Sequence, residues 1–236
     1  MREPLVFLPG MMSDARAFGP QLADLSRDTA VMVGPMTEGE RIEEIASGLL
    51  DVLPRRAALV GHGIGAVVAM EVQRRAPDRV ARLCLMHASP LADTPQEAAA
   101  RDPLIVRVRA GRLAEVMREE IPPEALGVDA PRHEILELVA DMAAVLGPEV
   151  FVRQMRALQR RRDQVTTLRK IAVPTLVLCG GQDPIVPLKR HSFMAELIPG
   201  AQLQVIEEAG HFPALEAPEA VAMALRDWMA QPLVLR

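Results

Sequence analysis

Short apolar runs alternate with longer segments of helical period at both ends of this chain, and that alternation constrains its fold most strongly. The runs end in Gly, Pro or Asp, as strands of a parallel sheet do when crossover helices connect them. Strands are predicted at 4–8, 30–33, 57–60, 80–86, 175–178 and 202–206. Helices are predicted at 15–25, 39–53, 66–76, 187–197 and 218–229. The sequence therefore predicts an α/β fold with a mostly parallel central sheet and helices on both faces.

The segment 91–167 breaks the alternation, because it contains helical patterns and no convincing strand. The helical patterns cover 104–119, 133–146 and 150–162. Prolines end helices, so we expect several short ones, separated by Pro103, Pro122, Pro123, Pro131 and Pro148. Open α/β sheets bind ligands outside the carboxyl ends of their strands, where a helical insertion acts as a lid. We predict a core formed by residues 1–90 and 168–236, with a helical cap at 91–167.

The composition is typical of one soluble domain. The 236 residues are 50% hydrophobic, and the formal net charge is −4. An acidic chain is not expected to bind nucleic acid or an anionic membrane surface. No stretch approaches the roughly 18 apolar residues that span a bilayer. The N-terminal MREPLVFLPG lacks a signal-peptide core, so a cytoplasmic location is expected. Cys84 and Cys179 lie in apolar runs and predict neither a disulfide nor a metal site.

The segment VGHGIGA at 60–66 joins an apolar strand directly to a helix. In the nucleophile elbow, G-x-S-x-G, the strand turns so sharply that the central residue is strained, and small flanking glycines let strand and helix approach. Gly61 and Gly65 match these flanks, whereas Gly63 stands at the nucleophile position without a hydroxyl. A plain glycine turn is the simplest alternative.

The same segment also satisfies G-x-G-x-x-G/A, the dinucleotide-binding fingerprint, through Gly61, Gly63 and Ala66. A dinucleotide site requires an acidic residue about 20 positions later, at the end of the next strand. That strand ends in MHAS, and the nearest acid, Asp78, precedes it. The fingerprint also normally opens the first βαβ unit, whereas this turn follows the third strand. Dinucleotide binding is therefore the minor alternative.

An acid and a histidine follow in the order that a catalytic triad of this fold requires. Asp183 lies just past the fifth predicted strand, and His211 lies in a Gly- and Pro-bounded loop before the last helix. A solvated turn is the alternative for Asp183, and a surface position is the alternative for His211. The backbone amides of Ile64 and of Met11, in the LPGMM loop after the first strand, would form an oxyanion hole. A simple β-turn is the alternative for that loop.

Four motifs together resemble the α/β-hydrolase family, in its single-domain form with a helical cap. They are LPGMM at 8–12, GHGIGA at 61–66 against the usual GHSxG, PTLVLCGGQDPIVP at 174–187 and GHFPALEAPE at 210–219. The resemblance covers essentially the whole chain, and the end of the cap is similar to bacterial esterase-like members. It implies hydrolysis of a carboxylic ester, thioester or lactone by a serine nucleophile, with no metal or organic cofactor.

Gly63 removes the central group of that mechanism. A serine there would attack the acyl carbon, His211 would take its proton, and Asp183 would orient the imidazole. Loss of the nucleophile costs a factor of about 10⁶ in turnover in a well-studied serine protease. This chain is therefore expected to be inactive or nearly so. Either glycine is an engineered replacement, which we favour because both partners remain, or the natural protein lost its hydroxyl. In the second case it is a binding or scaffold protein, or it uses water activated by His211.

Apolar residues of the cap and of the loops after the strands are candidates for the substrate pocket, although core packing is the alternative for each. These candidates are Met11, Met12, Phe18, Leu91, Met117, Phe151, Met155, Ile185, Val186 and Phe212. Such a pocket would be soft and would take an acyl group of small to medium length.

A basic run near the end of the cap is interpreted as a solvated helix face or as a docking surface for an acyl-carrier protein. Its arginines are Arg153, Arg156, Arg160, Arg161 and Arg162.

Overall fold

The core of the protein is a parallel sheet of six strands, as described for residues 3–233 in a computed structural model. The strands lie in the order β2-β1-β3-β4-β5-β6, and each neighbouring pair is parallel. Their bounds are β1 Leu5–Leu8, β2 Val31–Val33, β3 Ala57–His62, β4 Val80–Met86, β5 Thr175–Gly180 and β6 Gln202–Ile206. The predicted α/β class with a mostly parallel sheet is confirmed.

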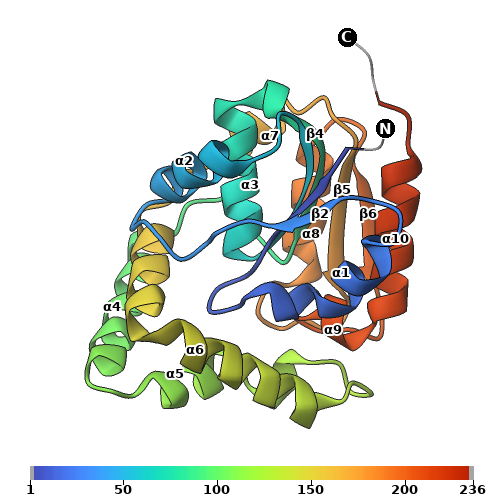
Figure 1. Cartoon of the computed structure of the whole chain (residues 1–236). Coiled ribbons are helices and arrows are strands. Elements are labelled where there is room, and N and C mark those ends of the chain that lie inside the picture. Colours follow the sequence, from blue (N-terminus) through green and yellow to red (C-terminus); the bar gives the residue numbers. More distant parts are fainter. Residues whose placement is uncertain (1–2, 234–236) are drawn as a thin grey trace.

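Helices cover both faces of the sheet (Figure 1). One face carries α2 Ile42–Val52, α3 Ile64–Arg75 and α8 Leu188–Leu197, and the other carries α1 Gly19–Leu25 and α10 Pro218–Ala230. The period of two along β1 explains both layers, because Leu5 and Phe7 join one apolar cluster while Val6 and Leu8 join the other. The sheet is therefore buried on both sides.

Five further helices of the described residues, in the core and in the segment 91–167, are short. They are the 3-10 turns Ala15–Phe18, Pro77–Arg79 and Pro123–Ala125, and the α-helices α7 Val165–Leu168 and α9 Pro213–Glu216. Within residues 3–233, the structure contains no helix that combines the length and the apolar character required to cross a membrane.

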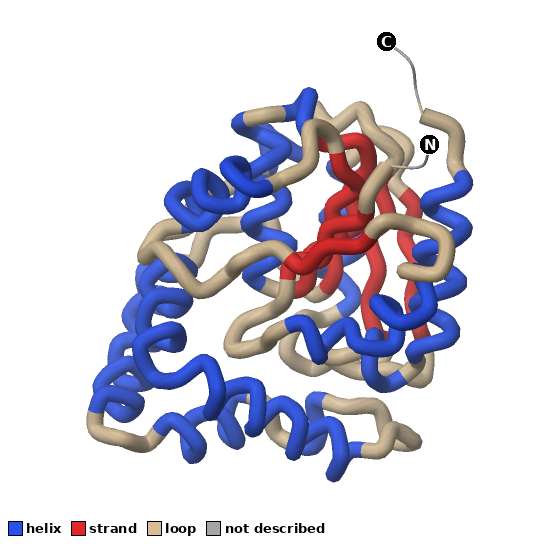
Figure 2. The backbone as a smooth tube through the Cα atoms, viewed as in Figure 1, coloured by secondary structure: helices blue, strands red, loops and turns tan. Residues whose placement is uncertain are grey.

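Three longer helices, α4 Pro95–Arg109, α5 Leu113–Glu120 and α6 Arg132–Gln159, lie beside the core and form the cap (Figure 2). The expected single helix at 104–119 is wrong. Thr94 and Glu97 form a capping box that starts α4 nine residues earlier than expected, and Gly111, with φ 83°, separates α4 from α5. Pro103 lies inside α4 and does not end it.

The predicted breaks at the later prolines do occur, since Pro122, Pro123 and Pro131 lie between α5 and α6. Gly147 has φ 80° and ψ 172°, which divides α6 into two helical segments near the predicted bounds of 146 and 150. Pro148 follows at the start of the second segment, where its missing N–H leaves no hydrogen bond unmade.

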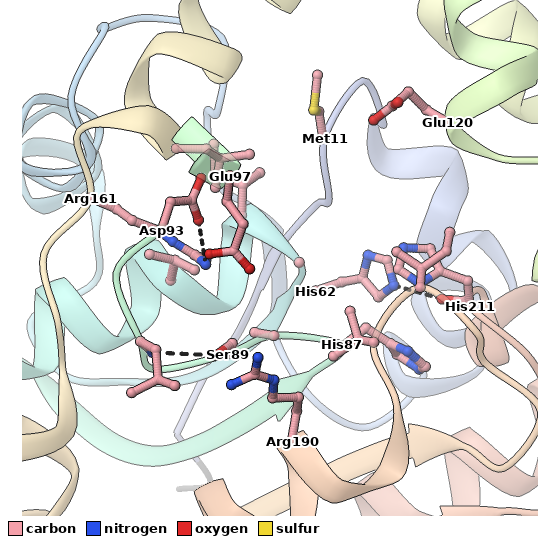
Figure 3. A pocket seen from close by; sticks show the side chains of 18 of the residues that line it. Met11, His62, His87, Ser89, Asp93, Glu97, Glu120, Arg161, Arg190 and His211 are labelled. Atoms are coloured by element: carbon pink, nitrogen blue, oxygen red, sulfur yellow. Dashed lines mark hydrogen bonds and ion pairs between the residues drawn. The ribbon is translucent and has the colours of Figure 1, made fainter. Parts of the chain in front are cut away.

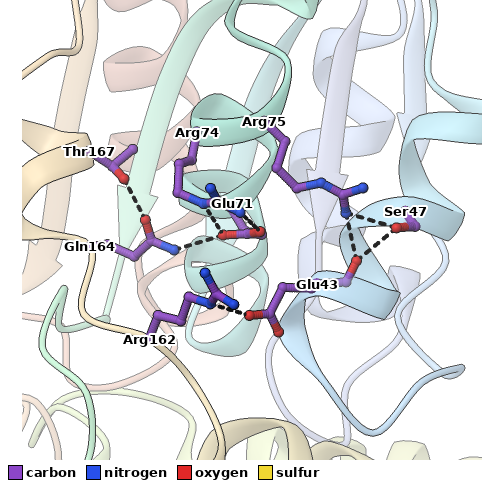
Figure 4. A network of polar contacts seen from close by, with 8 residues as sticks. All are labelled: Glu43, Ser47, Glu71, Arg74, Arg75, Arg162, Gln164 and Thr167. Atoms are coloured by element: carbon purple, nitrogen blue, oxygen red, sulfur yellow. Dashed lines mark hydrogen bonds and ion pairs between the residues drawn. The ribbon is translucent and has the colours of Figure 1, made fainter.

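A polar network ties the segment after the cap to α3 (Figure 4). The buried Glu71 carboxylate accepts hydrogen bonds from Arg74 at 2.6 and 2.8 Å and from the side-chain amide of Gln164 at 3.0 Å. Beside it, Arg162 donates to the Glu43 carboxylate of α2 at 2.6 Å. The chain that leaves the cap is thus held on the core through charged groups.

Candidate active site

The nucleophile elbow is present at the junction of β3 and α3. Gly63 has φ 53° and ψ −119°, a backbone conformation that side chains other than glycine adopt only under strain. A Cβ added at Gly65 would lie 2.0 Å from the Leu8 carbonyl oxygen, so only glycine fits there. At Gly63, by contrast, an added Cβ would meet only the Gly10 Cα, at 3.7 Å. The position therefore has room for a serine side chain.

Asp183 and His211 are brought together as the sequence predicts. The Nδ1–H of His211 donates to Asp183 Oδ2 at 2.9 Å, which leaves Nε2 with its lone pair, and His211 lines a cavity together with Gly63. Asp183 Oδ1 accepts the Ile185 amide at 2.7 Å. This arrangement has the geometry of a carboxylate that orients a general base.

A second histidine shares the same carboxylate oxygen. His87, directly after β4, donates through Nδ1 to Asp183 Oδ2 at 2.6 Å, and its Nε2 accepts the Gly180 amide at 3.2 Å. These two bonds assign the neutral imidazole, with its proton on Nδ1. The sequence assigns His87 no role in the triad, because it stands at the end of a strand and outside the four motifs. Its place at the carboxyl end of β4, beside the end of β5, was the available signal.

His62, the variable residue of the elbow, packs against His211 and hydrogen-bonds to its backbone. Its Nε2–H donates to the backbone carbonyl of His211 at 2.8 Å. The His62 ring also stacks on Phe212, with ring centroids 5.4 Å apart. A Cβ on Gly10 would lie 2.5 Å from His62 Nδ1, so the loop after β1 packs closely against this ring.

Burial determines the charge states of this cluster. Burial lowers the pKa of His87 to about 4 and holds the pKa of His62 well below its ordinary value. Burial alone would raise the pKa of Asp183, but hydrogen bonds from His211 and His87 outweigh it and hold that pKa far below its usual range. At neutral pH the site therefore contains a carboxylate and at least two neutral imidazoles.

The two amides proposed for the oxyanion hole are free. Among the hydrogen bonds of residues 3–233, none is donated by the backbone N–H of Met11 or of Ile64. The neighbouring Met12 amide is instead taken by the side chain of Gln154 in α6, at 2.9 Å. Two unpaired N–H groups flanking Gly63 are what an oxyanion hole requires.

The loop that carries His211 is clamped by Glu216. One of its oxygens accepts the amides of Gly127 and Gly210 at 2.6 and 2.8 Å, and the other accepts the Phe212 amide at 2.7 Å. The His211 amide donates to the Ala125 carbonyl at 2.7 Å. The backbone on both sides of the base is thus fixed, partly by the cap.

A cavity of about 540 Å³ opens above the elbow, between the strand ends and the cap (Figure 3). Seven of the ten predicted pocket residues line it, namely Met11, Leu91, Met117, Phe151, Ile185, Val186 and Phe212. The other three do not: Met12, Phe18 and Met155 are buried in the apolar core. Met155 still contacts the cavity wall from behind, because its sulfur accepts a hydrogen bond from the Arg101 guanidinium at 3.5 Å. The predicted role of all three as lining residues is corrected accordingly.

Sequence reasoning did not assign the charged side chains of the cavity. Asp93, Arg161, Arg190 and Ser89 line it (Figure 3). Arg101 lines it as well. Arg161 belongs to the predicted basic run, where its neighbours in sequence suggested a solvated face. The turn after α6 places Arg161 at the cavity, and that turn has no strong sequence signature.

The remaining arginines of the basic run have partners within the chain. The Arg153 guanidinium donates to the Thr37 carbonyl, Arg156 pairs with Asp102, Arg160 with Glu40, and Arg162 with Glu43. Carboxylate or carbonyl oxygens of the chain therefore pair with most of the positive charge of these arginines.

Three of the buried histidines, His62, His87 and His211, form a group that could hold a metal ion by residue type, since one nitrogen from each lies within 4.8 Å of the others. The hydrogen bonds argue against that use. Both ring nitrogens of His87 are engaged, by Asp183 and by the Gly180 amide. A metal would have to break one of these bonds, so the arrangement fits a hydrogen-bond network better than a coordination sphere.

Comparison with known proteins agrees with this geometry. A model described as "Alpha/beta hydrolase family" matches residues 5–224. The chain belongs to the alpha/beta hydrolase family. The resemblance stated from four motifs is confirmed at this level.

Three known proteins illustrate the similarity, which extends over most of this chain. A pimeloyl-[acyl-carrier protein] methyl ester esterase of Aromatoleum aromaticum is 30% identical over 207 residues, covering 82% of each protein. The solved structure of a thermophilic esterase from Thermogutta terrifontis, with malate bound, is 27% identical, has a TM-score of 0.86, and is matched over 96% of this chain and 89% of that one. An uncharacterized protein of Mycobacterium tuberculosis is 31% identical over 199 residues, but this chain spans only 57% of its length.

Proposed function

We propose that this protein binds a carboxylic ester, thioester or lactone in the cavity above Gly63, and that the missing hydroxyl makes it inactive or nearly so as a serine hydrolase. The observation that carries the proposal is the complete remainder of the site. Asp183 and His211 are hydrogen-bonded, the Met11 and Ile64 amides are free, and His211 faces the same cavity as Gly63. The esterases among its relatives support the substrate class.

The steps that the chain can still perform follow from these groups. The two amides can accept a developing oxyanion, and His211 Nε2 can take a proton from a bound water, with Asp183 stabilising the imidazolium. What is missing is the covalent acyl intermediate. Binding and the oxyanion hole alone leave roughly 10³ to 10⁴ over the uncatalysed reaction in triad enzymes without their nucleophile.

Restoring the hydroxyl tests the proposal. Gly63→Ser is expected to raise the hydrolysis of p-nitrophenyl acetate and butanoate at least about 100-fold over the parent chain, because a nucleophile is worth up to about 10⁶. Gly63→Ala is the matched control for backbone strain, since its Cβ has the same space without an oxygen. Adding His211→Ala to the serine variant should abolish the gain. A serine variant that folds, by circular dichroism, yet hydrolyses no faster than the alanine variant would contradict the proposal.

The origin of Gly63 is a separate question with its own test. An engineered replacement predicts a serine codon at position 63 of the natural gene, and a natural loss predicts a glycine codon. The retained Asp183–His211 pair supports the engineered origin, because a long-abandoned reaction would not select for both groups.

The proposed carrier of the acyl group is an acyl-carrier protein. The name of the Aromatoleum relative supports it. The pairing of Arg153, Arg156 and Arg160 with acidic or carbonyl groups of the chain leaves little free charge for docking at that face.

A further inference from the structure

The wall of the cavity away from His211 contains a cluster of shielded charged side chains, in which positive charges outnumber negative ones (Figure 3). The Asp93 carboxylate, whose side chain is 3% exposed, receives Arg101 Nε at 2.7 Å and Arg161 Nη2 at 2.8 Å. Two guanidinium groups thus share one carboxylate. Because both arginines are largely shielded from solvent, with side chains 23% and 14% exposed, the second positive charge has no equal counter-charge at this point.

Hydrogen bonding at Arg161 is also incomplete. Its Nε is buried and has no hydrogen-bond partner within the described residues. Burial lowers the pKa of Arg161, as expected for a cation whose environment solvates it poorly. Buried donors of native proteins are nearly always paired, so an unpaired one beside a cavity indicates a group that is supplied from outside.

A third guanidinium points into the same space from α8. Arg190 is half-buried and lines the cavity beside Ser89, and no ion pair to it occurs within the described residues (Figure 3). Hydrogen bonding with Thr94, whose amide donates to Glu97 at 2.7 Å, chiefly lowers the pKa of the Glu97 carboxyl, and the charges of Arg190 and Arg161 add to this.

The other charged side chains of the cavity wall do not cancel this excess of positive charge. Glu120 of α5 is the remaining acid, and burial raises the pKa of its carboxyl. Lys189 contributes a further cation. The lining therefore has one more positive than negative side chain even when every acid is ionised.

We infer that this wall binds an anionic group of the substrate, so that the protein takes esters carrying a free carboxylate, such as monoesters of dicarboxylic acids. A carboxylate offers two acceptors to the unfilled guanidinium donors, and an enclosed site strengthens that attraction. Met117, Phe151 and Leu158 line the same cavity and suit the methylene chain between the two ends. The inference rests on the proposed function for the ester end at His211.

Binding to the unaltered chain tests this, because Gly63 prevents rapid turnover. Isothermal titration calorimetry should compare monomethyl adipate, dimethyl adipate and inorganic phosphate. The monomethyl ester is expected to bind at least about 10-fold more tightly than the dimethyl ester, since a charge-assisted hydrogen bond is worth about one factor of ten or more. Arg190→Gln and Arg161→Gln should each reduce that ratio at least about threefold, whereas Arg169→Gln, at an exposed arginine outside the cavity, should leave it unchanged.

The outcomes separate this inference from the proposed function. Equal binding of the two esters overturns it, and so does a preference that survives Arg190→Gln, the variant that disturbs no ion pair of the fold. Phosphate binding as tight as that of the monoester also overturns it, because the anion would then be free phosphate. If the Gly63→Ser variant hydrolyses neutral esters without preferring the acidic monoester, the proposed function stands and this inference fails. If the monoester binds tightly and the binding depends on the arginines, but the Gly63→Ser variant hydrolyses no ester, this inference stands and the proposed function fails.

Discussion

Two residues of the candidate active site, Gly63 and His87, have a positive backbone angle φ. Gly63 has φ 53°, and His87, which is not a glycine, has φ 47°. A non-glycine residue in such a conformation costs on the order of 1 to 3 kcal/mol and persists only where its surroundings fix it. At His87 those surroundings are Asp183 and the Gly180 amide. We interpret His87 as a positioning residue that holds the carboxylate for His211.

Replacing His87 should weaken positioning without weakening binding. In the Gly63→Ser background, His87→Phe is expected to lower kcat about 10-fold, with a smaller change in KM, because Asp183 loses a hydrogen-bond donor while an aromatic ring still fills the position. His87→Gln should recover much of the loss, since its amide can still donate to Asp183. Steady-state kinetics on both variants checks this. If kcat falls equally in the His87→Phe and His87→Gln variants, His87 acts through its packing and not through its hydrogen bond to Asp183.

Sequence alone predicted the residues that belong to motifs. Asp183 and His211 followed from their order and from the strand ends that carry them. His87, Arg101 and Arg190 did not, because each lies in an ordinary strand or helix pattern, and only the tertiary fold turns it toward the site. Phe18 and Met155 show the reverse error, since an apolar residue near a strand end can equally well fill the core.

Among the elements, α3 links the candidate active site to the segment that leaves the cap. Its first residue supplies the Ile64 amide, and two turns later Glu71 anchors the chain that leaves the cap through Gln164 (Figure 4). The periodicity of the core elements could be predicted from sequence because strands and helices there each bury a regular apolar face. The cap was predicted less well, since its helix starts depend on capping groups such as Thr94 and Glu97.

Removing the anchor should destabilise the whole domain. Glu71→Leu leaves Gln164 and Arg74 without their acceptor and is expected to lower the free energy of unfolding by about 2 to 3 kcal/mol. Urea denaturation measures the loss. Glu196→Gln, at an exposed position of α8, is the control and should change stability by no more than about 0.5 kcal/mol. A loss at Glu71 no larger than the control's would show that the network is not needed.

For the molecule as a whole, the buried histidines make stability depend on pH. Burial lowers the pKa values of His62, His87 and His191 in the fold, to about 4 for His87. The unfolded chain protonates its histidines near pH 6.5, so between about pH 6.5 and 4 it binds more protons than the folded chain. Stability should therefore be complete above pH 7 and fall as the pH falls through this window. The lowered pKa of Asp183 adds a further loss below about pH 4.

Urea denaturation at a series of pH values measures this effect. Each such histidine contributes up to about 1.4 kcal/mol per pH unit to the slope. His87→Gln should flatten the slope between pH 4 and 6.5, whereas His133→Gln, on the solvent side of α6, should not change it. A parent chain whose stability is flat across that range would refute the assignment of neutral histidines.

The glycine at the elbow also determines whether activity-based chemical labelling can detect such a protein. Fluorophosphonate reagents find hydrolases of this kind by forming a bond to the serine oxygen, and at Gly63 there is no oxygen to label. A chemical survey of active enzymes would pass over this chain even while its cavity is occupied. The same property makes the protein suited to holding an intact ester for crystallography, so that its natural ligand could be identified by what remains bound after purification.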